Sequence, residues 1–445
     1  MIKDNIISLD NPEGKTDVLT DLLRSGAREL IKKAVQTELA EFLSQYQDMT
    51  DSEGRPLVVR NGYLPERELM TGIGPVDIKV PKTRDRGGQG IHFRSELLPP
   101  YIKRTKSVET VLPWLYLKGI STGDFSEALA ALLGKDAKGL SAGTISRLKQ
   151  CWVSEYDDWR VRDLSKEHYV YIWADGIYFN IRSDDAKQCI LVIIGVTSRG
   201  DKEFLAIEDG YRESEQSWTE VLLSLKDRGF RSPKLAVGDG ALGFWKAARK
   251  VFSQTRSQRC WVHKTANILN KLPKHSQAKA KQYIHDIWMA ETRENAEQAF
   301  DLFIKTYELK YPKATQCLEK DRDELLAFYD FPADHWAHIR TSNPIESTFS
   351  TIRLRTKKTR ACVSRSTILT MVYKLGLSAE KGWRKLRGFR RLADVINGVK
   401  FIDGVDEETF ERQRNTAKSY SHSPHLTITQ SIDLAYSRAT PYKLK

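Results

Sequence analysis

Residues 168–182 read HYVYIWADGIYFNIR, a run in which apolar and polar side chains alternate. This period of two predicts a β-strand with one face in a core. Two further strands are predicted after it: CILVIIGVTSRG (189–200) is nearly all apolar, as in a sheet interior, and DKEFLAIEDGYRE (201–213) follows it. Because the links between the three segments are short, we expect the strands to pair as antiparallel hairpins.

The next segments predict a strand–helix–strand unit. SEQSWTEVLLSLKDRG (214–229) has helical spacing and ends at Gly229. A fourth strand, a second helix and a fifth strand are predicted in SPKLAVGDG (232–240), ALGFWKAARKVF (241–252) and SQRCWVHK (257–264). Three antiparallel strands followed by such a unit is the element order of a ribonuclease H-like fold. We therefore expect an α/β core with a mixed five-stranded sheet, in which the first and fourth strands are neighbours.

The chain before this core predicts helical and small β modules. Apolar residues at helical spacing in 15–47 indicate one or two amphipathic helices, and the alternation in 58–94 indicates a small β-hairpin module. Three short helical blocks follow in 107–159, and the last carries Arg147 and Lys149. These blocks match a DNA-binding helix-turn-helix pattern. An ordinary three-helix packing unit, which is at least as common, fits them too.

The chain after the fifth strand is helical and charged up to about residue 331, and 369–401 predicts a further helix with a basic cluster. The polar tail after residue 403 predicts a loosely ordered end. The predicted domains are an N-terminal helical region (1–57), a small β module (58–105), a helix-turn-helix-like domain (106–160), the first part of the core (161–264), a helical domain (265–335), the last part of the core (336–400) and a tail (401–445).

The composition favours a folded protein with a polyanionic partner. Apolar residues make up 40% of the 445 residues, enough for two or three domains with cores. Lys and Arg exceed Asp and Glu by 71 to 58, which gives a net charge of +13. Neutralising phosphates is the main electrostatic use of such a surplus, although a basic protein without that partner can have the same composition.

The cysteines and the N-terminus bear on the compartment. The five cysteines are scattered and form no C-x-x-C, so we expect neither a disulfide framework nor a paired-cysteine zinc site. MIKDNIISLDNPEGK (1–15) has no basic segment followed by a hydrophobic core, and the longest apolar run is too short to span a bilayer. We therefore expect a protein of the reducing cytoplasm, with no membrane as partner.

Two carboxylates stand out by their position. Asp175 lies within the first predicted strand, in a run that otherwise avoids charge, and an acid buried there needs a partner. Asp239 follows the fourth strand, at a strand end of the kind where open α/β sheets place their sites, although Asp-Gly is also a common turn pair. Because the two strands are expected to be neighbours, both acids should lie together near the sheet centre.

A third carboxylate, Glu346, opens the helical part of HWAHIRTSNPIESTFSTIRLRTKKTR (335–360). Asn343 can cap that helix, and Pro344 suits its first turn. Glu346 precedes a basic strip suited to a polyanion such as DNA. A carboxylate so close to bound phosphate favours a divalent cation between the carboxylate and the phosphate. Asn343-x-x-Glu346 is equally an ordinary capping box before a solvated basic face. The basic residues of the strip are Arg353, Arg355, Lys357, Lys358 and Arg360.

Three carboxylates from distant positions can share one or two hard cations such as Mg²⁺ or Mn²⁺, which take oxygen ligands. A pair of such ions can activate a nucleophile and stabilise the leaving oxygen in a phosphodiester displacement. Weaker candidates lie in the links and on the third strand: Asp184, Asp185, Glu203, Glu208 and Asp209.

Several motifs mark a resemblance to the Mutator-type family of bacterial insertion-sequence transposases, which are DDE recombinases with a ribonuclease H-like core. The resemblance covers nearly the whole chain. One departure is Gly238, which precedes Asp239 where the family pattern leads us to expect Ser. The motifs are RNGY (60–63), LYLKGIST (115–122), Asp175-Gly176, VGDGALG (237–243), QRCWVHKTANIL (258–269) and RTSNPIES (340–347), of which the last three are specific to the family.

The resemblance implies site residues. It makes Asp175, Asp239 and Glu346 the catalytic, metal-binding triad for Mg²⁺ or Mn²⁺, with two ions expected. It marks Cys260 and His263, a C-x-x-H, as supporting residues, and the helical stretch between Asp239 and Glu346 as an all-α insertion domain. Asn343 would lie near the metal site. The residues expected to hold DNA backbone phosphates are Arg340, Arg353, Arg355, Lys357 and Lys358.

The implied function is binding to the terminal inverted repeats of an insertion sequence, hydrolysis at its ends, and attack of the freed 3′-hydroxyl on target DNA, in the bacterial nucleoid. Acting on two ends implies a homodimer at least. Two alternatives remain: a ribonuclease H-like DNA nuclease without strand transfer, and a domesticated DNA-binding protein without chemistry.

The C-x-x-H of Cys260 and His263 has interpretations of its own. It is half of a zinc site, which His335 and His338 could complete. We favour instead a buried cysteine and a histidine that is hydrogen-bonded near the acids, or a supporting role near the scissile phosphate.

Overall fold

The computed structural model describes residues 18–109, 111, 115, 129, 142–179, 188–210, 212–240, 242–358 and 365–421. The side chains of 142–149, 242, 351, 354–358 and 416–421 lie outside this description. The chain divides into two compact units, Met1–Leu148 and Lys149–Lys445. Most of the predicted helix-turn-helix falls outside the described residues, so it stays a prediction. Its third helix is present as α4 (Ala142–Arg160).

The first unit packs one long helix on short strands. Its elements are α1 (Val18–Ser44), β1 (Val58–Tyr63), β2 (Arg67–Thr71), β3 (Gly74–Ile78) and β4 (Pro81–Asp85). The strands pair antiparallel, β1 with β4 and β2 with β3. Val35 of α1 shares a core with Leu69 and Val76 of the strands. The short strands thus form within 58–94, as predicted. The segment 15–47, for which one or two helices were expected, forms the single helix α1 from Val18 onward.

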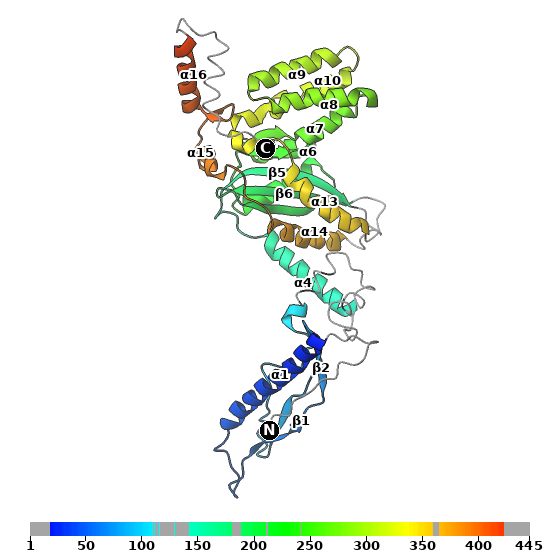
Figure 1. Ribbon diagram of the computed structural model, residues 1–445, viewed down its shortest axis with the longest axis vertical. Helices are drawn as coiled ribbons and strands as arrows, with labels where there is room; N and C mark the ends of the chain where they lie inside the picture. Colours follow the sequence, from blue (N-terminus) through cyan, green and yellow to red (C-terminus); the bar gives the residue numbers. More distant parts are fainter. Residues whose placement is uncertain are drawn as a thin grey trace. The chain divides into compact units, whose positions relative to one another are not determined.

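The second unit is built on a mixed five-stranded sheet, made of β5 (Tyr169–Phe179), β6 (Gln188–Thr197), β7 (Lys202–Gly210), β8 (Leu235–Gly238) and β9 (Arg256–Arg259). The strand order is β7-β6-β5-β8-β9, and Figure 1 labels the central strand β5 and its neighbour β6. β5, β6 and β7 pair antiparallel, whereas β8 pairs parallel with both β5 and β9. The predicted antiparallel trio and the adjacency of the first and fourth strands are confirmed.

Helices cover both faces of this sheet. On one face, Trp218 of α5 shares a core with Leu205 of β7. On the other face, the ring of Phe349 on α13 contacts that of Phe204, the neighbour of Leu205, and neighbouring strand residues point to opposite faces. The helices are α5 (Glu215–Asp227) and α6 (Leu242–Val251) on the first face, and α13 (Asn343–Lys358) and α14 (Arg365–Glu380) on the second.

The charged stretch after the sheet is helical, as predicted. The prediction of strand for 257–264 is wrong beyond Arg259, where β9 ends. Trp261, Lys264 and Ile268 are buried at helical spacing, so the segment packs as a helix with Cys260 at its N-cap. The helices are α7 (Trp261–Leu269), α8 (Lys274–Met289), α9 (Arg293–Tyr307), α10 (Pro312–Glu319), α11 (Arg322–Leu326), the short η1 (Ala327–Asp330) and η2 (Ala333–His335), and α12 (Trp336–Ile339).

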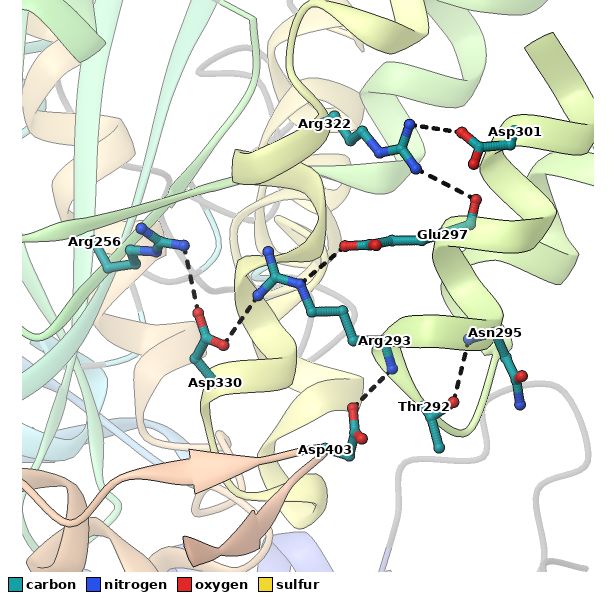
Figure 2. A network of polar contacts seen from close by, with 9 residues as sticks. All are labelled: Arg256, Thr292, Arg293, Asn295, Glu297, Asp301, Arg322, Asp330 and Asp403. Carbon is teal, nitrogen blue, oxygen red and sulfur yellow. Dashed lines mark hydrogen bonds and ion pairs between the residues drawn. The ribbon is translucent and has the colours of Figure 1, made fainter.

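A polar network ties these helices to the sheet and to the C-terminal part of the chain (Figure 2). Arg293 of α9 lies at its centre. The Arg293 guanidinium contacts Asp330 at 3.1 Å, and Asp330 also faces Arg256 of β9 at 3.4 Å. The backbone N–H of Arg293 donates to the carboxylate of Asp403 over 2.7 Å. The network fixes the helical region that separates Asp239 from Glu346 along the chain.

The prediction of a loosely ordered end is wrong for residues up to 421. Residues 401–406 form the antiparallel hairpin of β10 (Phe401–Ile402) and β11 (Val405–Asp406), and α16 (Glu407–Ser421) follows. The side chain of Asp406 accepts the backbone N–H of Thr409 over 2.9 Å, which caps α16. Residues 422–445 lie outside the described part. None of the described helices has the length and apolarity needed to cross a bilayer.

Candidate active site

Asp175, within β5, and Asp239, directly after β8, lie at the same level of two adjacent parallel strands. Ala174 of β5 is paired with Gly238 of β8, and each acid is the next residue of its chain. Both side chains are half-buried. Burial, with the negative charge of Asp239 as the second cause, raises the pKa of Asp175 to about 7. The two acids predicted to lie together are therefore brought into electrostatic contact.

The backbone of Asp239 is held firmly. Its carbonyl accepts hydrogen bonds from the Trp245 indole and from the Arg259 guanidinium, both over 2.7 Å. The Arg259 guanidinium also lies over the Trp245 ring, 4.6 Å from its centroid, and faces Asp321 at 3.7 Å. These contacts fix the point at which Asp239 leaves the sheet.

Glu346 reaches the site from the first turn of α13. The hydroxyl of Ser342 donates to the carboxylate of Glu346 over 2.9 Å, and the Ser342 carbonyl accepts the Glu346 N–H over 3.2 Å. Ser342 therefore occupies the cap position, because α13 begins at Asn343. The expectation that Asn343 caps this helix is wrong, and Asn343 is exposed within the first turn. The helix packs on the sheet through Ile345, Phe349 and Ile352, which are buried.

The same hydroxyl joins Glu346 to the C-x-x-H. The Ser342 oxygen lies 3.2 Å from the sulfur of Cys260 and 3.3 Å from Nδ1 of His263. Nδ1 of His263 is 3.6 Å from the nearer carboxylate oxygen of Glu346. The structure thus brings Cys260, His263 and Glu346 together around one side chain, Ser342, to which the sequence analysis gave no role.

Cys260 and His263 shift each other's protonation. Burial alone would raise the pKa of Cys260, but hydrogen bonds with His263 and Ser342 outweigh it and lower the pKa. The hydrogen bond with Cys260 raises the pKa of His263 to about 9 against the effect of burial, and the charges of Asp175 and Glu346 add to the rise. A protonated His263 would place a positive charge between these acids.

Two donor sets share Glu346: the predicted triad with Asp175 and Asp239, and the group with Cys260 and His263, whose ligand atoms the structure brings together. Carboxylate oxygens of Asp175, Asp239 and Glu346 suit a hard cation, and its charge would oppose the burial and the repulsion by Asp239 that together raise the pKa of Asp175. The ligand atoms of Cys260, His263 and Glu346 lie within 4.8 Å of one another, a donor set suited to zinc. Glu346 belongs to both sets, so one ion bound by the second set would compete for it.

The two histidines considered for a zinc site lie elsewhere. His335 is buried, and its ring nitrogens contact the hydroxyl of Tyr171 at 2.8 Å and the carbonyl of Gly388 at 3.0 Å. Nε2 of His338 accepts the backbone N–H of Arg387 over 3.4 Å. Neither belongs to the cluster of Cys260 and His263.

A fourth carboxylate, Glu213, was missed by the sequence analysis. A Cβ built on Gly176 would lie 2.4 Å from the carboxyl carbon of Glu213, so Glu213 packs directly against the residue that follows Asp175. Burial and then the charge of Asp239 raise the pKa of Glu213. The usable signal was the pair Asp175-Gly176: a glycine in an otherwise bulky strand indicates that another chain segment approaches closely.

The predicted DNA-binding residues fall into three groups. The Arg340 guanidinium already has protein partners, since it donates to the carbonyl of Trp288 over 2.8 Å and lies over the Trp288 ring at 4.5 Å. Arg353 is exposed on α13. The others lie on described helices with side chains outside the described part: Arg147 and Lys149 on α4, and Arg355, Lys357 and Lys358 on α13.

An open pocket of about 550 Å³ adjoins Glu346, lined by Lys202, Ala337, His338, Asn343, Pro344, Glu346 and Ser347. Its wall therefore joins β7, α12 and the first turn of α13. The pocket gives a ligand access to the carboxylate of Glu346.

Comparison with known proteins fits this arrangement. The family model described as "Transposase, Mutator family" matches residues 2–385. The transposase for insertion sequence element IST2 of Acidithiobacillus ferrooxidans is 51% identical over 280 residues, which cover 63% of this chain and 95% of that protein. The transposase for IS6120 of Mycolicibacterium smegmatis is 49% identical over 66% of this chain and 91% of its own. The transposase for IS905 of Lactococcus lactis is 30% identical over 76% and 84%, respectively. The chain therefore belongs to the Mutator family of transposases.

Proposed function

We propose that this transposase is a DDE enzyme on a ribonuclease H-like core, and that it cleaves DNA at the ends of an insertion sequence and joins those ends to target DNA. The observation that carries the proposal is the register of β5 with β8, which sets Asp175 beside Asp239. The strand order, with three antiparallel strands followed by two parallel ones, supports the same fold.

Asp175, Asp239 and Glu346 would hold a divalent cation, Mg²⁺ or Mn²⁺. We expect a second ion to bind beside the first. When bound, such a cation lowers the pKa of the attacking water or hydroxyl and stabilises charge on the leaving oxygen. The chain's own residues orient the acids: Ser342 directs the carboxylate of Glu346, and Arg259 with Trp245 fixes the backbone of Asp239.

The DNA substrate would lie along basic surfaces. Arg353 is exposed on α13, the helix whose first turn carries Glu346, and Arg355, Lys357 and Lys358 follow on the same helix. Guanidinium and ammonium groups neutralise backbone phosphates without reading sequence. Arg147 and Lys149 on α4 stay candidates for recognition of the terminal repeats. A homodimer would bring the two ends together.

The test is strand cleavage of a terminal-repeat duplex in Mg²⁺. Asp175→Asn, Asp239→Asn and Glu346→Gln should each reduce cleavage at least about a thousandfold while DNA binding persists, because each removes a ligand charge at nearly constant volume. The matched control is Asp227→Asn, an exposed acid at the end of α5, which should cleave like the wild type. Full cleavage in all three variants would refute the assignment.

A second assay separates the alternatives. A pre-cleaved end with a free 3′-hydroxyl is incubated with a target plasmid. Joined product is expected. Cleavage without joining would indicate a nuclease, and DNA binding without either reaction in Mg²⁺ or Mn²⁺ would indicate a protein that has lost its chemistry.

A further inference from the structure

We propose that Arg384, Arg387 and Arg390, here called the basic rim, bind the sugar–phosphate backbone of DNA beside the Glu346 pocket. The proposal rests on the proposed function, since it takes the reacting strand to enter this pocket. The sequence analysis noted a basic cluster in 369–401 but gave it no partner.

The three guanidiniums are available. All three residues are exposed, and none of them forms an ion pair with a residue that the structure describes. Their neighbours differ: Lys385 pairs with Asp201 at 3.2 Å, and Arg391 pairs with Asp406 at 3.6 Å. Positive charges without ion-pair partners among the described residues favour the binding of a polyanion.

The backbone that carries the basic rim is pinned in place between α14 and α15 (Leu392–Ile396) (Figure 1). The N–H of Leu386 donates to the carbonyl of Gly200 over 2.8 Å. The carbonyl of Gly388 lies 3.0 Å from Nε2 of the buried His335. Gly388 has φ of +69°, and a Cβ there would lie 2.4 Å from the side chain of Asp334, so the chain is fitted closely to its support. A fixed backbone reduces the ordering cost of binding.

The same backbone contacts the pocket wall. Lys202 and His338 line the pocket together with Glu346. Nζ of Lys202 donates to the carbonyl of Arg384 over 3.3 Å, and the N–H of Arg387 donates to Nε2 of His338 over 3.4 Å. Burial, with the positive charges of Lys202 and Arg387 among the further causes, lowers the pKa of His338 to about 4. In the pocket wall beside Glu346, Lys202 thus carries the positive charge and His338 is neutral.

This chemistry favours a phosphate backbone over a small anion. The pocket is open, and the three arginines lie at every third position of a segment without strand or α-helix, with Arg387 in a turn and Arg390 in the short 3-10 helix η3 (Phe389–Arg391). Three exposed guanidiniums suit a run of phosphates, each of which a guanidinium can bind with two hydrogen bonds. The backbone could belong to the insertion-sequence end or to the target, and the assays below distinguish the two.

The experiment compares Arg384→Gln/Arg387→Gln/Arg390→Gln with a control, Arg231→Gln/Arg249→Gln/Lys250→Gln. The control residues are exposed on and near the α6 side of the sheet. Both triples are made in the Asp175→Asn background, so that binding is measured without cleavage. Fluorescence anisotropy with a terminal-repeat duplex and with an unrelated duplex is recorded from low to high salt. A charge-keeping Arg→Lys triple and a thermal melt control for folding.

The rim triple should reduce the slope of log K against log salt by about 2 to 3, roughly 0.9 for each phosphate that the protein no longer neutralises. The control triple and the Arg→Lys triple should keep the slope. If binding to the terminal-repeat duplex is unchanged, the triple variant of the basic rim is tested for strand transfer with Asp175 intact. Joining of a pre-cleaved end to target DNA should then fall at least about tenfold, which would assign the basic rim to target DNA. A triple variant with the wild-type salt slope and the wild-type rate of strand transfer would refute the role proposed for the basic rim. A wild type that binds DNA but never cleaves it would instead contradict the proposed function.

Discussion

Asp239 and Glu346, two of the three proposed metal ligands, are held by supports of different kinds. Asp239 follows a strand paired with β5 at four positions, and its carbonyl accepts hydrogen bonds from Trp245 and Arg259. The carboxylate of Glu346 accepts the hydroxyl of one residue, Ser342, at the start of a helix. The strand-borne acid is thus fixed through the fold, and the helix-borne acid through a single side chain. Damage to the first support should therefore lower the free energy of unfolding more than damage to the second, while both should lower activity.

The largest effect is expected for Arg259→Met. It removes the buried guanidinium that binds the Asp239 carbonyl and faces Asp321. We expect the free energy of unfolding to fall by about 3 kcal/mol, as for a broken buried ion pair, and cleavage to fall more than about a hundredfold. Urea denaturation and end cleavage measure the two.

Arg256→Met is the matched control on the same strand. Arg256 is exposed and faces Asp330 at 3.4 Å. Its loss should cost less than about 1 kcal/mol and leave cleavage near the wild-type rate. Equal effects of the two substitutions would contradict the special role of the Arg259 contact.

A smaller effect is expected for Gly176→Ala. The new methyl would overlap Glu213, which must move away from Asp175. Overpacking of this kind costs about 1–3 kcal/mol, and we expect cleavage to fall about tenfold. Gly26→Ala, where a Cβ meets nothing within 4 Å, serves as the control. Glu213→Ala should recover the stability lost by Gly176→Ala, and a double variant no more stable than the single one would contradict the overlap.

Ser342→Ala tests the helix-borne support. Loss of one hydrogen bond to a charged group lowers the free energy of unfolding by about 1.5 kcal/mol, half of the effect expected for Arg259→Met, and we expect kcat for cleavage to fall about tenfold because Glu346 is no longer directed. The concentration of Mn²⁺ needed for half-maximal cleavage should rise. Ser342→Thr keeps the hydroxyl and should restore both values. A threonine variant as slow as the alanine variant would show that the hydroxyl is not the cause.

The smallest effect concerns pH. The pKa of His263 is raised from 6.5 to about 9, so its contribution to stability is full below pH 6.5 and is lost as the pH rises through about 9. The contribution should be on the order of 1 kcal/mol, since solvent screens a side chain that is 34% exposed. The difference in unfolding free energy between wild type and His263→Gln should shrink over this range. A constant difference from pH 6 to 10 would contradict it.

The sheet could be predicted because its strands carry their pattern locally. The alternation around Asp175 and the apolar run of β6 each indicate burial within one segment, and the short links limit how the strands pair. The same reasoning placed Asp175 beside Asp239. It failed at Cys260 and beyond, where residues that alternate over a few positions also fit one face of a helix.

The rest of the site depends on contacts between distant segments. Ser342 and Cys260 are far apart in sequence, and no local pattern shows that one hydroxyl will join Glu346 to His263. Glu213 lies in a link whose path depends on how α5 packs. Helix α16 was missed because its helical spacing is mostly polar, while the capping acid Asp406 gave a local sign of its start.

Binding of Mn²⁺, measured by isothermal titration calorimetry, tests the central claim most directly. We predict binding by the wild type that is lost in Asp175→Asn and Asp239→Asn and kept in Cys260→Ser, because the strand-borne acids and Glu346 form the site of the hard cation. Binding that survives both aspartate substitutions and disappears in Cys260→Ser would contradict the account, since the ion would then belong to Cys260, His263 and Glu346.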